Sequence, residues 1–219
     1  MSGATLALLQ GALAEIYDLP ATPDVREYLM TDRAHLVGLG VARHTDEQLI
    51  VAEEGDTLSM ALYIDAAVLE RLGRHDPFTE LTHENLADYL TAAEGVSHFV
   101  YVAWNTGHDK PVTLLELELQ AEVDKYVLGA WLLLEQGAGR FPRELHRALF
   151  ERARVDPVAA AGRLGLYHTA SSYAARFCRR VAALLEGKRT GATRDLLAEL
   201  RRFYRWGNVR KLRHIERYA

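Results

Sequence analysis

The sequence has only one cysteine, Cys178, among 219 residues, so no internal disulfide framework can form. It has no run of about 18 uninterrupted apolar residues, so we find no transmembrane span and expect no membrane partner. The apolar stretch from Thr5 to Ala14 lacks the basic start of a signal peptide. Phosphate-binding glycine loops, the G-x-S-x-G nucleophile pattern and the H-E-x-x-H zinc pattern are also missing. These absences predict a cytoplasmic protein and leave its chemistry open.

The composition is that of a soluble globular chain, with 49% hydrophobic and 26% charged residues. The net charge of −4 is unevenly distributed, because residues 1–139 carry −16 and residues 140–219 carry +12. We therefore distinguish an acidic N-terminal region (1–139) from a basic helical C-terminal region (140–219), and expect the two to pack as one domain. Such asymmetry indicates either binding of a nucleic acid or acidic surface, or packing of basic on acidic parts within a chain or a homodimer.

Apolar spacing predicts a helix over residues 4–17, and a second short helix is expected from Asp24 to Met30. Two β-favourable runs, 47–53 and 57–65, are separated by a short polar gap that contains Gly55. This arrangement predicts an antiparallel β-hairpin near residues 47–64. Further helices are expected over 142–154, after Asp156, over 169–186 and from Arg194 onward. The expected fold class is α+β and predominantly α-helical, a helical bundle with one small β-hairpin.

Residues 98–120 have two interpretations. By composition, 98–104 and 112–120 flank a turn-rich stretch and would form a β-hairpin, in which leucines alternate with acidic residues. By helical spacing, apolar residues recur from His83 onward, and Thr113 with Glu116 forms a capping box, which is typical of a helix start. We favour the helical hairpin. The choice matters because the first candidate site exists only if both segments are helical.

That candidate is a carboxylate and histidine cluster. Glu94 and His98 are four residues apart and share a helix face, as do Glu118 and Glu122 on the next helix. An antiparallel hairpin would bring all four to similar heights. Carboxylates facing a Glu and His pair are the ingredients of a metal site in a helical bundle, and this ligand set suits Mn, Fe or Zn.

The alternative is a structural salt-bridge network in which His98 is an ordinary interior residue. The helix from Thr113 has two apolar sides separated by two polar stripes, so only one stripe can easily face open water. The other stripe would be partly buried, where unpaired carboxylates are costly. The two stripes consist of Glu116, Gln120 and Asp124, and of Glu118, Glu122 and Lys125.

The second candidate is the C-terminal region, where basic residues are interleaved with aromatic ones. Basic side chains neutralise the phosphates of a nucleic acid, and aromatic rings stack on the nucleobases of a single strand. The alternative is an amphipathic helix that docks through Leu196, Leu200 and Phe203. The residues proposed to contact a protein or nucleic-acid partner are Arg201, Arg202, Arg205, Arg210, Lys211 and Arg213.

The third candidate is the pair Arg163 and His168, which form an Arg-x-x-x-x-His pattern. The pattern resembles the catalytic motif of the HEPN family of helical ribonucleases, and the resemblance covers only these two residues. It implies that the arginine and the histidine act on an RNA phosphodiester, in a protein that is usually a homodimer.

From the sequence alone, our leading hypothesis is a binding or regulatory protein that uses its basic C-terminal helices. A metal-dependent enzyme or metal-binding bundle is the alternative, and a HEPN-like ribonuclease is a further one. No cofactor is established by the sequence beyond the hypothesis of a divalent transition metal, and whether the chain is an enzyme stays open.

Overall fold

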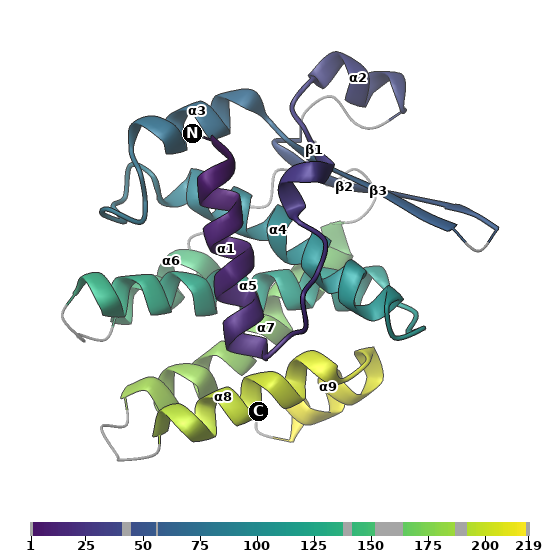
Figure 1. The fold of residues 1–219 in the computed structure, drawn as a ribbon. Coiled ribbons are helices and arrows are strands. Elements are labelled where there is room, and N and C mark those ends of the chain that lie inside the picture. The colour runs from purple at the N-terminus through teal and green to yellow at the C-terminus, as the bar shows by residue number, and fades with distance from the viewer. Residues whose placement is uncertain are drawn as a thin grey trace.

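Two long helices, α4 (Leu86–Thr106) and α5 (Leu114–Gln136), form a hairpin at the centre of the molecule (Figure 1). The computed structural model describes residues 2–40, 45–55, 57–137, 142–151, 164–186 and 192–217. The prediction of helix over residues 98–120 is confirmed. As the capping pattern predicts, the Thr113 hydroxyl accepts a hydrogen bond from the Glu116 N–H at 3.2 Å. The Glu116 carboxylate is buried, and it accepts hydrogen bonds from Tyr101 of α4 and from the Asn208 N–H of α9 (Asn208–Glu216).

The helix α5 has neighbours on every side, which differs from the sequence expectation. Four helices contact it: α1 (Ser2–Tyr17), α4, α6 (Arg143–Phe150) and α7 (Leu164–Glu186). Both polar stripes are therefore removed from water, whereas we expected one stripe to face open solvent. Glu122 is partly exposed. The other five residues of the two stripes are at most 9% exposed: Glu116, Gln120, Asp124, Glu118 and Lys125. A helix surrounded in this way must satisfy its polar groups inside the protein.

Helix α1 crosses the central hairpin and packs on α4, α5 and α8 (Ala192–Arg205) (Figure 1). Its buried residues keep the predicted helical spacing: Leu6, Leu9, Leu13 and Ile16. On the far side, α7 (Leu164–Glu186) packs along α5, and α8 (Ala192–Arg205) and α9 (Asn208–Glu216) follow it. The acidic and basic regions thus contribute to one continuous hydrophobic core.

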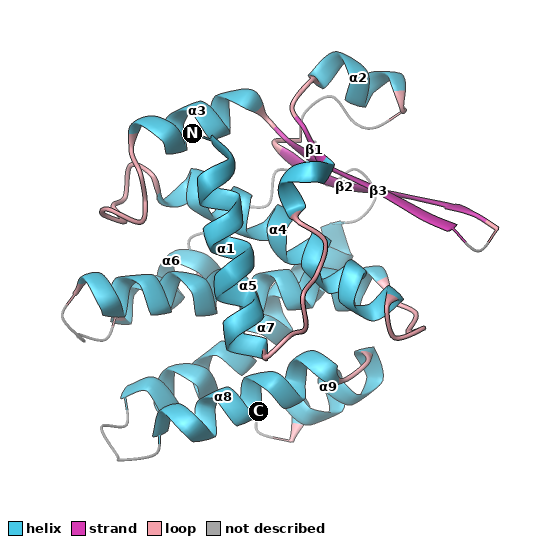
Figure 2. Ribbon diagram, in the orientation of Figure 1, coloured by secondary structure: helices cyan, strands magenta, loops and turns pink. Residues whose placement is uncertain are grey.

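A small three-stranded sheet packs on α4 (Figure 2). Strands β2 (Glu47–Glu54) and β3 (Thr57–Ile64) form the predicted antiparallel hairpin. The short strand β1 (Leu29–Met30) pairs with β3 in parallel. The helix expected from Asp24 to Met30 is therefore wrong: a single 3-10 turn, Val25–Tyr28, is followed by β1, because pairing with β3 takes the last two residues into the sheet.

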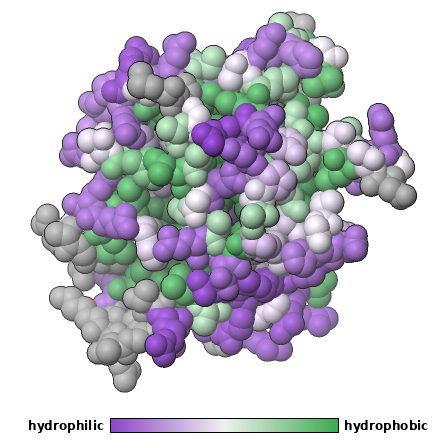
Figure 3. All heavy atoms as spheres, viewed as in Figure 1, coloured by the Kyte–Doolittle hydropathy of each residue, from purple (hydrophilic) through white to green (hydrophobic). Residues whose placement is uncertain are grey.

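The remaining helices are short. They are α2 (Arg33–Gly38), α3 (Ala66–Arg74) and α6 (Arg143–Phe150). Helix α7 begins at Leu164, five residues before the expected start at Thr169, and the helix expected after Asp156 lies outside the described residues. Within the described residues no helix has the length and apolarity that crossing a bilayer requires. In the view of Figure 3, hydrophilic side chains cover much of the lower part of the molecule, where α8 and α9 lie.

Candidate metal-binding site

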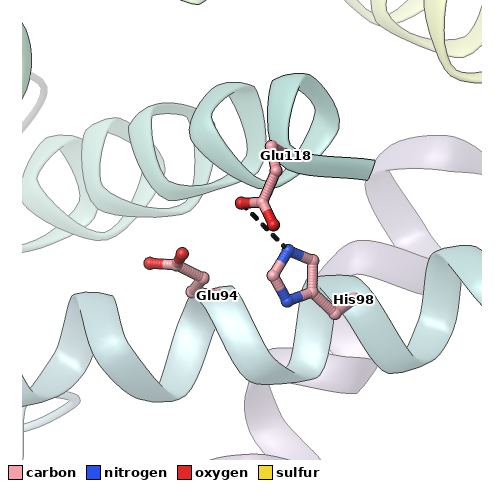
Figure 4. A group of neighbouring side chains, drawn as sticks. All are labelled: Glu94, His98 and Glu118. Carbon is pink, nitrogen blue, oxygen red and sulfur yellow. Dashed lines mark ion pairs between the residues drawn. The ribbon is translucent and has the colours of Figure 1, made fainter. Parts of the chain in front are cut away.

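The hairpin of α4 and α5 brings three of the four predicted metal ligands together. Glu94 and His98 project from successive turns of α4, and Glu118 projects toward them from α5 (Figure 4). One ligand atom from each of these residues lies within 4.8 Å of the other two. The predicted spacing on each helix and the predicted match in height across the hairpin account for this arrangement.

His98 is buried at the centre of the group, with 5% of its surface exposed. Its Nε2 atom lies 3.7 Å from Oε2 of Glu118 and has no hydrogen-bond partner. The distance is too long for a hydrogen bond, which for nitrogen and oxygen is about 2.7–3.2 Å. The two groups therefore form an ion pair without a hydrogen bond (Figure 4).

The sheet adds a carboxylate that was not among the four ligands predicted from the sequence. The Oε2 atom of Glu47, the first residue of β2, lies 3.6 Å from Nδ1 of His98 on the opposite edge of the imidazole. Gly95 permits this approach: a Cβ atom there would lie 3.1 Å from Glu47 Oε2 and 3.0 Å from Leu62 Cδ1. A glycine inside an otherwise strong helix was the one sequence signal for close packing at this point.

The fourth predicted ligand, Glu122, lies beside the group and is engaged by a lysine. The Lys125 ammonium donates hydrogen bonds of 2.8 Å to Oε1 of Glu122 and 2.8 Å to Oε2 of Glu94. Lys125 thus links a carboxylate of α5 to one of α4. We name Glu47, Glu94, His98, Glu118, Glu122 and Lys125 the carboxylate cluster.

Burial and charge perturb the carboxylate cluster in opposite directions. Burial raises the pKa of Glu47, with the charge of His98 opposing it, and burial likewise raises the pKa of Glu122 against the pull of Lys125. Burial acts to raise the pKa of Glu94 as well, but the Lys125 ammonium overcomes it and lowers that pKa. For His98 burial favours the neutral ring, yet the carboxylates of Glu47 and Glu118 outweigh it and raise the pKa. Four carboxylates face one ammonium and one imidazole, so the cluster attracts further positive charge.

The donor set fits a divalent transition metal. Donor atoms bound to one ion at about 2.1 Å in tetrahedral directions lie about 3.4 Å apart, so ligand atoms within 4.8 Å of one another must approach by up to about 1.4 Å. Imidazole with carboxylates suits Mn, Fe or Zn. Glu47 stands where a carboxylate partner of a metal-bound histidine is commonly found, on the second ring nitrogen.

The six basic residues predicted to contact a partner have diverse surroundings. Arg201 donates to the backbone carbonyls of Ile16 and Glu15, and Arg205 to that of Asp18, all at the end of α1. Arg202 pairs with Glu199 at 2.6 Å. Lys211 is 0% exposed and so does not lie on the predicted surface. Arg210, which lies over the Trp206 ring at 4.6 Å, and Arg213 are exposed.

The interleaved aromatic residues are also largely internal. Phe203 stacks on Phe177 at 3.9 Å and Tyr204 on Tyr17 at 4.1 Å, and both C-terminal rings are buried. The helix α8 docks through Leu196, Leu200 and Phe203, all at most 3% exposed. For the ribonuclease pattern, His168 is exposed on the first turns of α7, and Arg163 lies outside the described residues.

A second buried polar group occupies the other stripe of α5. Lys211 of α9 donates to Gln120 at 2.7 Å and to the Tyr101 hydroxyl at 2.8 Å. Tyr101 donates to Glu116 at 2.5 Å. Asp124 accepts from Ser97 at 2.6 Å, from Gln120 at 2.7 Å and from Tyr17. The polar side chains of this group are joined by hydrogen bonds, whereas in the carboxylate cluster Nε2 of His98 and Oε2 of Glu47 have no hydrogen-bond partner.

Comparison with known proteins found no match to the chain among family models, curated proteins or solved structures.

Proposed function

We propose that this chain is a cytoplasmic metal-binding protein that holds one divalent transition metal ion between α4 and α5, with Glu94, His98 and Glu118 as ligands. The observation that carries the proposal is the Nε2 atom of His98, which is buried, lacks a hydrogen-bond partner and faces the Glu118 carboxylate. A buried polar atom without a partner costs about 1–3 kcal/mol, which a metal–nitrogen bond would remove.

The competing interpretation is a closed salt-bridge network, and three contacts in the same protein argue against it. In the carboxylate cluster itself, Lys125 reaches both of its glutamates at 2.8 Å. Elsewhere, Nε2 of His214 contacts Oε1 of Glu199 at 2.5 Å, well inside hydrogen-bonding distance. The corresponding distance from His98 to Glu118 is 3.7 Å. His98 and Glu118 therefore lack the short contact that Lys125 makes with its glutamates and that His214 makes with Glu199.

A bound ion would supply Lewis-acid chemistry at this position. The residues of the chain would hold and orient it: Glu94 and Glu118 as oxygen ligands, His98 as the nitrogen ligand, and Glu47 as the acceptor that fixes the imidazole through Nδ1. An enzymatic role follows only if the ion keeps a position for water or a small substrate, and we therefore restrict the proposal to metal binding.

Elemental analysis of untagged protein, purified without chelator, tests the proposal. We expect about one equivalent of Mn, Fe or Zn in the wild-type protein, and its loss in His98→Ala and in Glu118→Gln. The matched control is His83→Ala, which removes an exposed histidine outside the cluster and should keep the metal. A folded wild-type protein that contains no metal, and whose melting temperature does not change on addition of Mn²⁺, Fe²⁺ or Zn²⁺, would refute it.

Binding of a protein or nucleic-acid partner by the basic C-terminal helices stays a prediction. Its remaining support is the exposure of four of the six predicted arginine and lysine residues: Arg202, Arg205, Arg210 and Arg213. A steep dependence of nucleic-acid binding on salt concentration would support it.

A further inference from the structure

The ammonium of Lys125 lies between two glutamates that come from different helices. Its Nζ atom is 2.8 Å from Oε2 of Glu94 on α4 and 2.8 Å from Oε1 of Glu122 on α5. Lys125 is 9% exposed, so this positive charge is held inside the protein. The ammonium helps to neutralise the pair of carboxylates in the way that a bound metal ion would.

Glu94 belongs both to this pair and to the group formed with His98 and Glu118. A carboxylate that faces two positively charged centres at once is the arrangement of two-metal sites, in which the ions are about 3.5–4 Å apart. In this protein one of the two centres is the lysine ammonium, and the other is the position proposed for the metal ion.

We infer that Lys125 acts as a built-in second cation, which limits the carboxylate cluster to one divalent ion and determines its stoichiometry. The inference rests on the proposed metal-binding function. Charge balance supports it. Two divalent ions would neutralise the four glutamates of the cluster, whereas one divalent ion together with the ammonium leaves a single negative charge. With Lys125 present, a second divalent ion would make the cluster positive in a buried location, which is costly.

Removal of Lys125 should therefore open a second site for a divalent ion. It would free Oε2 of Glu94 and Oε1 of Glu122, the two oxygens that now accept from the ammonium. These carboxylates come from facing helices, so they can hold an ion between them as they now hold the ammonium. The second ion would depend on Glu122, whereas the first would depend on His98.

The experiment counts bound ions by native mass spectrometry, after loading with Mn²⁺ alone or Zn²⁺ alone and removal of the excess. We expect one ion in the wild-type protein and two in Lys125→Met. The double variant Lys125→Met/Glu122→Gln should return to one ion, and Lys125→Arg, which keeps the charge, should also bind one. The matched control Lys110→Met removes an exposed lysine on the loop between α4 and α5 and should bind one.

Each outcome decides a different point. No ion in the wild-type protein overturns the proposed function. One ion in both the wild type and Lys125→Met keeps the proposed function and overturns the role of Lys125, and two ions in the wild type do the same. If Lys125→Met does not fold, Lys125→Gln provides the same comparison with a neutral side chain that can still donate hydrogen bonds. The wild-type count tests the inference in either case.

Discussion

The ammonium of Lys211 donates a hydrogen bond of 2.7 Å to the side-chain carbonyl of Gln120, a residue 91 positions away in the sequence. It also lies 4.4 Å from the centre of the Tyr101 ring, and the lysine is 0% exposed. The last described helix, α9, is thus attached to the central hairpin by a buried charge. Burying an ammonium is costly unless it is well bonded, and the cost should appear in the pH dependence of stability.

Replacement of Lys211 by methionine should flatten the rise of stability above pH 7. Burial lowers the pKa of Lys211 to about 7, with Glu116 and Asp124 opposing the shift. Between about pH 7 and the pKa of an unfolded lysine, the unfolded chain binds more protons, so the free energy of unfolding rises with pH. The slope from this residue is at most about 1.4 kcal/mol per pH unit. Urea denaturation of the wild type and Lys211→Met at pH 7, 8 and 9 measures it.

The control for this comparison is Lys110→Met, which should keep the wild-type slope. Asp124, whose pKa burial raises to about 6, contributes in the opposite direction: stability falls as the pH rises from about 4 to about 6. The Lys211 charge helps to hold the pKa of Asp124 down, so in Lys211→Met this contribution extends to higher pH and adds to the loss of slope. Parallel pH profiles for wild type and Lys211→Met would show that the ammonium carries no such penalty.

Gly95→Ala should destabilise the protein by about 1–3 kcal/mol, as overpacking of a core does. The new methyl group would lie 3.0 Å from Leu62, which is 0% exposed, and 3.1 Å from Glu47. Gly11→Ala is the matched control, because it lies in α1 with nothing within 4 Å of an added Cβ atom. There the higher helix propensity of alanine should stabilise the protein by up to about 1 kcal/mol. Thermal denaturation distinguishes the two, and equal effects would contradict the close packing of β2 on α4.

The sequence predicted the parts of the candidate site that depend on local spacing. Glu94 and His98 share a face because they are four residues apart on one helix, and Glu118 faces them because the turn at 107–113 is short. Glu47 was missed, because its position depends on how a strand far away in the sequence packs against α4. The burial of both polar stripes of α5 was also missed, since it depends on how α1 and α7 cover the hairpin.

Glu47→Gln should weaken metal binding by about 10–100-fold without changing the number of ions bound. Its carboxylate faces Nδ1 of His98 at 3.6 Å, and loss of the carboxylate partner of a ligating histidine typically has an effect of this size. Glu53→Gln, an exposed glutamate in the same strand, is the control and should bind as the wild type does. Competition with a chelator measures both affinities. A complete loss of the ion in Glu47→Gln would instead make Glu47 a ligand.

Arg201→Ala should lower the free energy of unfolding by about 1–2 kcal/mol. Helix α1 ends at Tyr17, where Asp18 adopts a left-handed conformation with φ of 53° and the last carbonyls lack partners within the helix. Arg201 donates to two of these carbonyls, at 3.0 and 3.2 Å, and its charge lies at the negative end of the helix dipole.

Arg213→Ala removes an exposed arginine of α9 and should change stability by less than about 0.5 kcal/mol. A comparison of the two variants by urea denaturation therefore separates arginines that hold the fold from those that are free to contact a partner. If Arg201→Ala leaves stability unchanged, its contacts with α1 contribute nothing measurable, and the residue returns to the set available for partner binding. If only Arg201→Ala is destabilised, the positive charge of residues 140–219 serves the fold in part, because it binds carbonyl groups of the acidic region.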